Sequence, residues 1–177
     1  MIKELSIHFL TTLLFFLIIS LIQGLFSLSY WPFWVGGLLG TILPDVDHLL
    51  YVYFLKPSEL TSQRVNHLAS QGSFRSALEL LYATRSERKG LIFHTIFFQL
   101  LFFVLTFFVL TSTGGLLSRG VALAFFLHLY TDQIIDWRQL GSIDNWQNNL
   151  QLSLNSDRQK AYIAAGGLAV LFFALLF

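Results

Sequence analysis

Residues 5–27 read LSIHFLTTLLFFLIISLIQGLFS, an apolar run in which His8 is the one ionisable side chain. About 20 such residues in a helix are enough to cross the hydrocarbon core of a bilayer. The basic start is typical of a secretory signal, but the apolar stretch is too long and no small-residue cleavage site follows it. The segment therefore predicts an uncleaved membrane anchor.

The composition extends this prediction to the rest of the 177-residue chain, with 55% hydrophobic, 16% aromatic and 12% charged residues and a mean hydropathy of +0.65. These values are typical of a polytopic membrane protein. We expect an all-α fold, a polytopic membrane helical bundle of about five transmembrane helices in a single integral membrane domain over residues 1–177. The predicted spans are 5–27, 32–55, 91–111, 121–138 and 160–177.

The loop 56–90 contains the string GSFRSALELLYATRSERKG, which predicts an amphipathic helix. Its apolar positions recur at helical spacing, and Arg75, Glu79 and Arg85 fall elsewhere on the helical wheel. Such a helix suits the headgroup boundary, where it would cover polar groups at the ends of the spans. The alternative is a helix packed on the bundle with no role as a lid.

The positive charges predict the orientation. If Lys3 is cytoplasmic, the loops around 56–90 and 138–160 are cytoplasmic too, and Arg119 alone among the 11 Lys and Arg residues lies outside. Cytoplasmic loops of membrane proteins retain Lys and Arg, so the bias predicts a multi-pass protein with a cytoplasmic N-terminus. The absence of cysteine excludes disulfides and thiolate ligands, so any metal must use nitrogen and oxygen ligands.

The apolar runs nevertheless contain several ionisable side chains. Placing one at the centre of a bilayer costs about 2.5–3.5 kcal/mol on insertion scales, so such groups should converge on one another or on a metal. Counting from the cytoplasmic ends of the spans, four helices bring His or Asp to a similar depth in one leaflet. The residues concerned are His8, Asp45, Asp47, His48, His94, His128, Asp132 and Asp136.

Two strings carry most of this signal. In LPDVDH (43–48), Pro44 predicts a kink or restart of the helix, which puts Asp45 and His48 on one face and Asp47 elsewhere. The alternative for Asp45 is a helix cap.

In HLYTD (128–132), His128 and Asp132 share a helical stripe that continues to Asp136, and such a pair commonly gives a divalent metal two ligands. His8 and His94 are weaker candidates alone, since a lone His near the end of a span is often an interfacial residue.

The order of these motifs resembles the YdjM-like family of bacterial inner-membrane metal-dependent hydrolases. The shared features are an early His in the first span, LPDVDH in the second, the pair His94–Thr95 opening the third, and HLYTD in a later span. The resemblance implies a compact helical membrane domain in a bacterial inner membrane. It implies metal ligands at His8, Asp45, His48, His94, His128 and Asp132.

The chain also departs from that family. Where the family has an HRGxTHS-like string, residues 89–95 read KGLIFHT, so Lys89 and Gly90 replace a His and an Arg. Catalysis weakened or lost beside a retained metal site is the alternative that this departure raises.

The leading functional hypothesis is a membrane-embedded metal-dependent hydrolase with one or two divalent ions (Zn, Mn or Fe). Asp47 or Asp136 would be its general base. Its expected partner is a membrane lipid, a phospholipid or polyprenyl phosphate whose charge Arg85, Arg88 and Lys89 would attract, and no nucleic acid is expected.

A non-catalytic subunit of a larger membrane complex, or of a self-assembly, is the second hypothesis. It would retain the metal or bind a cofactor such as haem, and residues 36–40 (GGLLG) supply a GxxxG packing motif. An ion or proton transporter is the third hypothesis, which the apolar outer halves of the spans disfavour.

Overall fold

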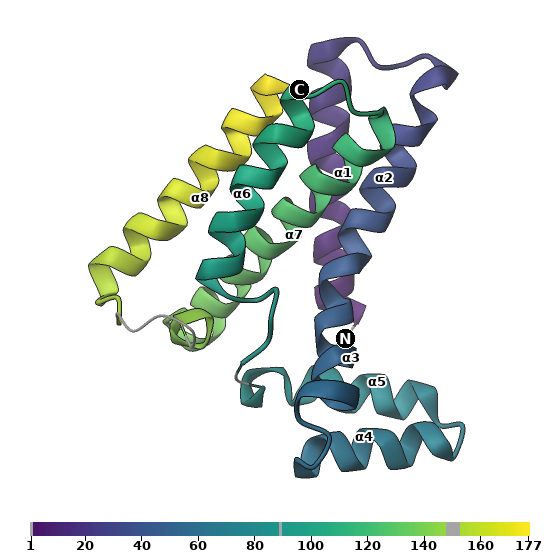
Figure 1. The fold of residues 1–177 in the computed structure, drawn as a ribbon, viewed down its shortest axis with the longest axis vertical. Coiled ribbons are helices and arrows are strands. Elements are labelled where there is room, and N and C mark those ends of the chain that lie inside the picture. The colour runs from purple at the N-terminus through teal and green to yellow at the C-terminus, as the bar shows by residue number, and fades with distance from the viewer. Residues whose placement is uncertain (1, 89, 148–152) are drawn as a thin grey trace.

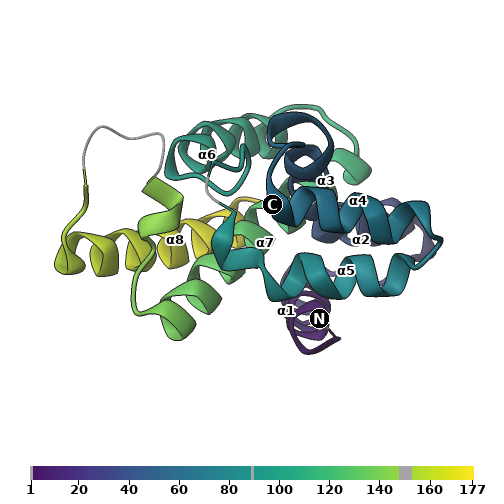
Figure 2. The same cartoon turned by 90° about the horizontal axis from the view of Figure 1, so that it is seen from below.

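The computed structural model describes residues 2–88, 90–147 and 153–177, and throughout this part of the chain the regular secondary structure is helical. Figure 1 shows α1, α2, α6, α7 and α8 as a bundle of long helices, with α4 and α5 below one end. Figure 2, seen from below, shows α4 and α5 lying next to each other across that end. The prediction of an all-helical protein is confirmed.

Short 3₁₀ turns and one π turn (Tyr51–Leu55) lie between several of the helices. The α-helices are α1 (Ile2–Gln23), α2 (Trp31–Ile42), α3 (Val46–Leu50), α4 (Leu60–Ser70), α5 (Phe74–Ala83), α6 (Ile96–Thr111), α7 (Leu116–Leu140) and α8 (Ser156–Leu176).

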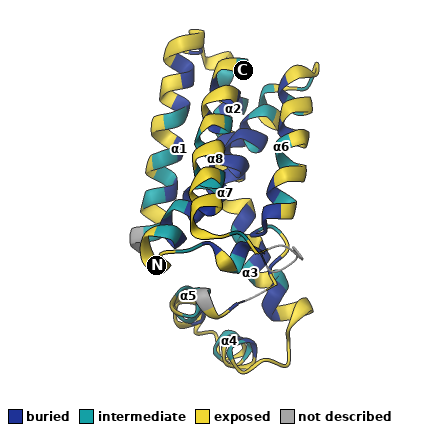
Figure 3. Ribbon diagram, turned by 90° about the vertical axis from the view of Figure 1, so that its left-hand side faces the viewer, coloured by how far each residue is buried: buried dark blue, intermediate teal, exposed yellow. Residues whose placement is uncertain are grey.

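Within the described residues, three helical segments are long and apolar enough to cross a membrane: Glu4–Gln23, Leu28–Leu55 and Ser156–Leu176. The helix α6 is apolar but shorter, at 16 residues. Large apolar side chains are exposed along α1 and α8, whose outward faces Figure 3 shows mostly as exposed residues. An apolar surface of this extent is typical of a protein that lies against lipid or a partner, so the fold is compatible with a membrane protein.

Three glycines allow α2 and α7 to pack at very short range. A Cβ atom at Gly36 would overlap the carbonyl oxygen of Leu117, and one at Gly40 would overlap that of Val121. Gly120 on α7 is the matching position on the other helix, since a Cβ atom there would overlap the carbonyl oxygen of Phe33. The GxxxG motif is thus used inside the molecule, and this close approach brings the end of α2 against the middle of α7.

The predicted restart at Pro44 is present as a 3₁₀ turn, Leu43–Asp45, between α2 and α3. The predicted boundary of the third span needs correction, because α6 begins at Ile96 rather than at residue 91. Gly90 has a positive φ of 91°, and the Thr95 hydroxyl caps α6 by accepting a hydrogen bond from the backbone N–H of Phe98. His94 therefore lies on the segment that leads into α6.

The amphipathic helix predicted after residue 72 corresponds to α5, which ends at Ala83. Ala77 and Leu81 on its inner face are buried with Val52 and Val65, so α5 packs on the end of the bundle through this small core. Phe74 and Leu78, which belong to the same apolar stripe, remain exposed.

Candidate metal centre

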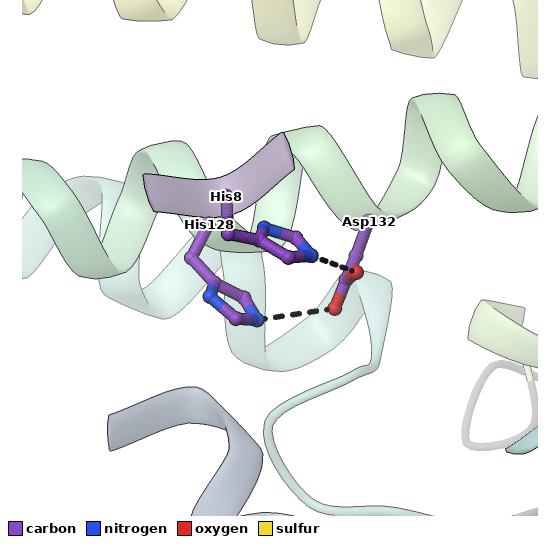
Figure 4. A group of neighbouring side chains, drawn as sticks. All are labelled: His8, His128 and Asp132. Atoms are coloured by element: carbon purple, nitrogen blue, oxygen red, sulfur yellow. Dashed lines mark ion pairs between the residues drawn. The ribbon is translucent and has the colours of Figure 1, made fainter. Parts of the chain in front are cut away.

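The carboxylate of Asp132, on α7, is the point on which the predicted residues converge. Its Oδ1 lies 3.0 Å from His8 Nε2 and 2.8 Å from Arg85 Nη2. Its Oδ2 lies 3.0 Å from His94 Nε2 and 3.3 Å from His128 Nε2. Four segments of the chain thus meet at one carboxylate that is almost completely buried, and Figure 4 shows His8 and His128 directed toward it.

The hydrogen bonding of His128 defines which of its nitrogens is free. Its Nδ1 lies 2.7 Å from the backbone carbonyl oxygen of Thr41, at the end of α2. Because a carbonyl oxygen only accepts, Nδ1–H donates there, and Nε2 of the neutral ring presents a lone pair to Asp132. A lone pair facing a carboxylate is repulsive unless a proton or a metal cation lies between them.

His94 is held in the same manner by Asp47. His94 Nδ1 lies 3.1 Å from Asp47 Oδ2 and Nε2 lies 3.0 Å from Asp132 Oδ2, so in a metal-bound ring Nδ1–H would donate to Asp47 and Nε2 would face the ion. Asp47 also accepts from three consecutive backbone N–H groups, those of Ile92 (3.0 Å), Phe93 (2.6 Å) and His94 (3.2 Å). A histidine that ligates a metal nearly always donates its other N–H to a carboxylate or a carbonyl, and both His94 and His128 have this arrangement.

His8 completes the group from α1. Its ring stacks on that of His128, with centroids 4.0 Å apart and planes 11° from parallel. Its Nδ1 is buried and, within the described part of the chain, has no hydrogen-bond partner. Stacking thus fixes the ring while Nε2 remains directed at Asp132.

The geometry fits a divalent ion. The ligand atoms of His8, His128 and Asp132 all lie within 4.8 Å of one another, so this buried group can hold a metal ion. Ligands bound at about 2.1 Å in a tetrahedral site stand roughly 3.4 Å apart. The 3.0–3.3 Å separations between the imidazole nitrogens and Asp132 are close to that spacing. Imidazole and carboxylate ligands suit zinc, manganese or iron.

The other two predicted ligands lie farther out. Asp45 Oδ1 is 3.7 Å from His128 Nε2, and the Asp45 side chain is 32% exposed. It makes no capping hydrogen bond to the helix that follows. His48 stacks on His94 with centroids 5.0 Å apart, and its Nδ1 accepts a hydrogen bond from Arg88 Nε at 3.2 Å. Its lone pair is therefore used by an arginine, and in this arrangement His48 supports the group instead of joining it.

The two predicted general bases, Asp47 and Asp136, both already accept hydrogen bonds from other protein groups. Asp47 is completely buried behind His94 and accepts the hydrogen bonds described above. Asp136 Oδ2 accepts from Trp146 Nε1 at 2.7 Å and from Asn145 Nδ2 at 3.0 Å, while its Oδ1 lies 3.4 Å from Arg85 Nη2. These contacts make both carboxylates positioning groups in this arrangement, because neither presents an oxygen free of donors.

Arg85 and Arg88, just after α5, differ in their surroundings. Burial opposes the charge of Arg85, but the carboxylates of Asp132 and Asp136 outweigh it and raise the pKa of Arg85. Burial, followed by the positive charge of Arg85, lowers the pKa of Arg88 to about 10. Arg88 donates to His48, to Thr84 Oγ1 and to the carbonyl oxygen of Leu81. These hydrogen bonds connect the end of α5 to His48 on α3. Lys89, the third predicted anion-attracting residue, lies outside the described residues.

A cavity of about 310 Å³ adjoins this group. Its walls come from α1, from the end of α2 with α3, and from α5. The exposed apolar side chains at its edge are Leu5, Ile42, Val46, Leu49 and Leu78. Its polar lining is His8, Asp45, His48, Tyr82, Arg85 and Arg88. The cavity therefore joins the polar group to an apolar outer surface.

Sequence reasoning missed the contact of Arg85 with Asp132, the carbonyl of Thr41 and the role of Trp146. The signal for Arg85 was its place just after the amphipathic helix, since a helix covering the ends of the spans delivers its last residues to the polar group there. Thr41 carried no signal, because its backbone oxygen is what contacts His128.

Comparisons of the chain with protein-family models, with curated proteins and with solved structures gave no match. The proposed function therefore rests on the site geometry and on the sequence motifs.

Proposed function

We propose that this protein is a membrane-embedded, metal-dependent hydrolase that acts on an amphiphilic lipid. The observation that carries the proposal is the convergence of His8, His94 and His128 on Asp132, with the second nitrogen of two of these rings held as a donor. Three imidazoles and one carboxylate form a nitrogen and oxygen ligand set suited to zinc, manganese or iron, and hydrolysis requires that the ion also keep a position open for water. The motif order, similar to that of YdjM-like proteins, agrees with this proposal.

The proposal includes a five-span topology in a bacterial inner membrane, with α6 and α7 added to the three long apolar segments. The N-terminus and the helices α4 and α5 lie at the same end of the bundle, and the C-terminus lies at the other (Figure 1). Arg119, the one basic residue predicted outside, is near the start of α7. Retention of Lys and Arg on the cytoplasmic side then makes the α4–α5 end cytoplasmic.

The substrate class follows from the 310 Å³ cavity. Apolar side chains at its edge suit a hydrocarbon tail, and the polar lining suits a phosphate or ester head. A phospholipid or a polyprenyl phosphate in the cytoplasmic leaflet has both parts. Arg85 and Arg88 both line the cavity, and their positive charges would attract the head in addition to the protein groups that each already contacts.

The protein residues have distinct roles in this proposal. A divalent ion held by His8, His94, His128 and Asp132 supplies Lewis acidity to the reaction. Asp45 is 32% exposed, lines the cavity and lies 3.7 Å from His128 Nε2, so we assign it the role of general base in place of Asp47 and Asp136. The apolar walls limit the access of bulk water to the site.

A second candidate function is a non-catalytic membrane subunit in which the metal is structural. The engagement of both Asp47 and Asp136 by donors favours it, since a structural site needs no free base. Exposed Phe97, Leu101 and Phe108 on α6 offer an apolar face to a partner.

The test has two stages. Elemental analysis of the purified protein and of the variants Asp132→Asn and His128→Ala should find about one divalent ion per chain in the wild type and much less in both variants. Tyr51→Phe, which removes a hydrogen bond to Glu59 outside the group, is the matched control and should retain the metal.

Metal-depleted protein is then refilled with Zn²⁺, Mn²⁺ or Fe²⁺ and given vesicles containing phosphatidic acid, phosphatidylglycerol or a polyprenyl phosphate. Release of phosphate, headgroup or fatty acid that requires the metal and is lost in Asp45→Asn supports hydrolysis. Metal binding with no product from any lipid would favour the structural subunit. A wild type that binds no metal would remove both forms of the proposal.

A further inference from the structure

A second cavity, of about 380 Å³, lies on the other side of α7, between α6 and α8. Figure 1 shows these two helices next to each other, and they are in contact. Its lining is mostly apolar and includes Leu100, Phe103, Phe126 and Phe172. Gln99 and Tyr162 form its polar end.

Small side chains on α8 create this hollow. Ala165, Gly166 and Ala169 line it at a spacing that places them on one helical face. A larger residue at Ala165 or Ala169 would fill part of this space. At Gly166 itself α8 packs closely on α7, since a Cβ there would meet the ring of Tyr130.

The polar end contains an incomplete hydrogen-bond network of uncharged groups. Gln133 Nε2 donates to Gln99 Oε1 at 2.5 Å, and the Tyr162 hydroxyl donates to the same oxygen at 2.6 Å. Gln99 is 3% exposed and Gln133 is fully buried. Within residues 2–88, 90–147 and 153–177, Gln99 Nε2 and Gln133 Oε1 have no hydrogen-bond partner. A donor and an acceptor thus remain unsatisfied in a buried position, which is costly unless a further molecule pairs with them.

We propose that this cavity binds one single-chain lipid whose head is uncharged and carries hydroxyl groups, such as a monoacylglycerol. A hydroxyl both donates and accepts, so it matches the two polar groups of the lining: it accepts from the free Nε2–H of Gln99 and donates to the phenol oxygen of Tyr162. The cavity lining contains no charged side chain, so an anionic or cationic head would lie unpaired there. The proposal is independent of the metal group and of hydrolysis.

The dimensions agree with a chain in one leaflet. Tyr162 at the polar end and Phe172 at the far end are separated by ten residues of α8, about 15 Å at helical rise. That is roughly half of a 30 Å hydrocarbon core, the depth occupied by the tail of one lipid. Gln99 lies in the first turn of α6 and Tyr162 in the second turn of α8, at the end where the headgroup of such a lipid would be.

The test is a native mass spectrometry titration of the purified full-length protein with monoolein, methyl oleate and oleate. Monoolein has hydroxyls and no charge, methyl oleate lacks hydroxyls, and oleate is charged. We expect a monoolein dissociation constant at least tenfold lower than those of the other two. Monoolein bound no more tightly than methyl oleate would overturn the proposal and leave water as the partner of Gln99.

Variants locate the site. Ala169→Phe fills the hollow and should abolish monoolein binding, whereas Ala164→Phe, exposed on the same helix outside the lining, should leave it unchanged. Gln99→Leu should raise the dissociation constant about tenfold. Equal binding in Ala169→Phe and the wild type would overturn the proposal, and the ligand comparison in the wild type decides if Gln99→Leu does not fold. Asp132→Asn should keep monoolein binding, so failure of the metal proposal would be seen separately.

Discussion

Asp132 and Gln133 are neighbours in α7, both almost completely buried, yet they belong to two polar groups of different kinds. Asp132 receives His8, His94, His128 and Arg85 from one side. Gln133 lies on the other, with Gln99 and Tyr162, in a network without charge. One helix thus separates a charged group from a neutral one.

The difference shows what each kind of group requires in an apolar bundle. A buried carboxylate is stable only when it is paired, and Asp132 has an arginine and three imidazoles whose free nitrogens can share a cation. Neutral amides need only hydrogen bonds. Within the described residues, Gln99 Nε2 and Gln133 Oε1 still lack a hydrogen-bond partner. The charged group accordingly points to metal chemistry and the neutral one to binding of an uncharged polar head.

The largest effect should come from Asp132→Ala compared with Gln133→Ala. Removing Asp132 leaves Arg85 buried without its closest carboxylate, and breaking a buried ion pair costs about 3–5 kcal/mol. Removing Gln133 leaves the Tyr162–Gln99 hydrogen bond in place and should cost about 1 kcal/mol. Equilibrium unfolding in mixed micelles measures both, and elemental analysis should find the metal lost in the first variant alone.

Asp132→Asn, which keeps the shape, controls for the cavity left by alanine. Equal destabilisation by the two alanine variants would mean that the charged group contributes no more than the neutral one, and the contrast between them would be wrong.

How much of this contrast could be predicted from sequence depends on the residue. His8, His128 and Asp132 were predicted because ionisable groups in apolar runs are rare and costly, and the i, i+4 spacing of His128 and Asp132 survives any error in span boundaries. The restart at Pro44 followed from local stereochemistry. Gln99 and Gln133 could not be predicted to interact, because an isolated Gln in an apolar helix contains no sequence pattern that indicates a partner 34 residues away.

The roles within the charged group could not be predicted, because they depend on long-range contacts. Asp47 and Asp45 are two residues apart and equally acidic, but Asp47 meets the backbone of residues 92–94 while Asp45 faces the cavity. That distinction arises from the non-helical path before α6, which sequence reasoning had assigned to a span. Periodicity predicts which face a residue occupies and does not predict what the rest of the chain brings to that face.

The close packing of α2 on α7 offers the next test. Gly40→Val inserts a side chain where the carbonyl oxygen of Val121 lies, and overpacking of this kind costs about 1–3 kcal/mol. The displaced end of α2 should take the Thr41 carbonyl away from His128 and lower the metal content, while the neutral group is unaffected. Gly115→Val, which changes a glycine with open space around it and a negative φ of −68°, is the control for loss of a glycine without helix contact. Unchanged metal content in Gly40→Val would show that α2 does not position His128.

A smaller effect is expected from Asp47→Asn. The substitution keeps an oxygen for the backbone N–H groups but weakens the acceptor for His94 Nδ1–H, and loss of such outer contacts typically lowers metal affinity about 10–100-fold. Competition with a chelator of known affinity measures the change. Because Asp47 is not among the proposed ligands, the variant should still bind metal at saturating concentrations. Complete loss of the site would instead make Asp47 a ligand.

Tyr162→Phe should give the smallest change and acts on the neutral group alone. It removes one hydroxyl, whose hydrogen bond to Gln99 Oε1 is 2.6 Å long, while Gln133 still donates to that oxygen. A single neutral hydrogen bond contributes about 1 kcal/mol, and the half-buried position of Tyr162 makes that an upper value. Unfolding in micelles should detect the loss, and metal content should stay at the wild-type level. A fall in metal content would mean that the charged and neutral groups are coupled through α7. The proposal of a metal centre on one side and a separate lipid site on the other requires that the two groups be independent, so that result would contradict it.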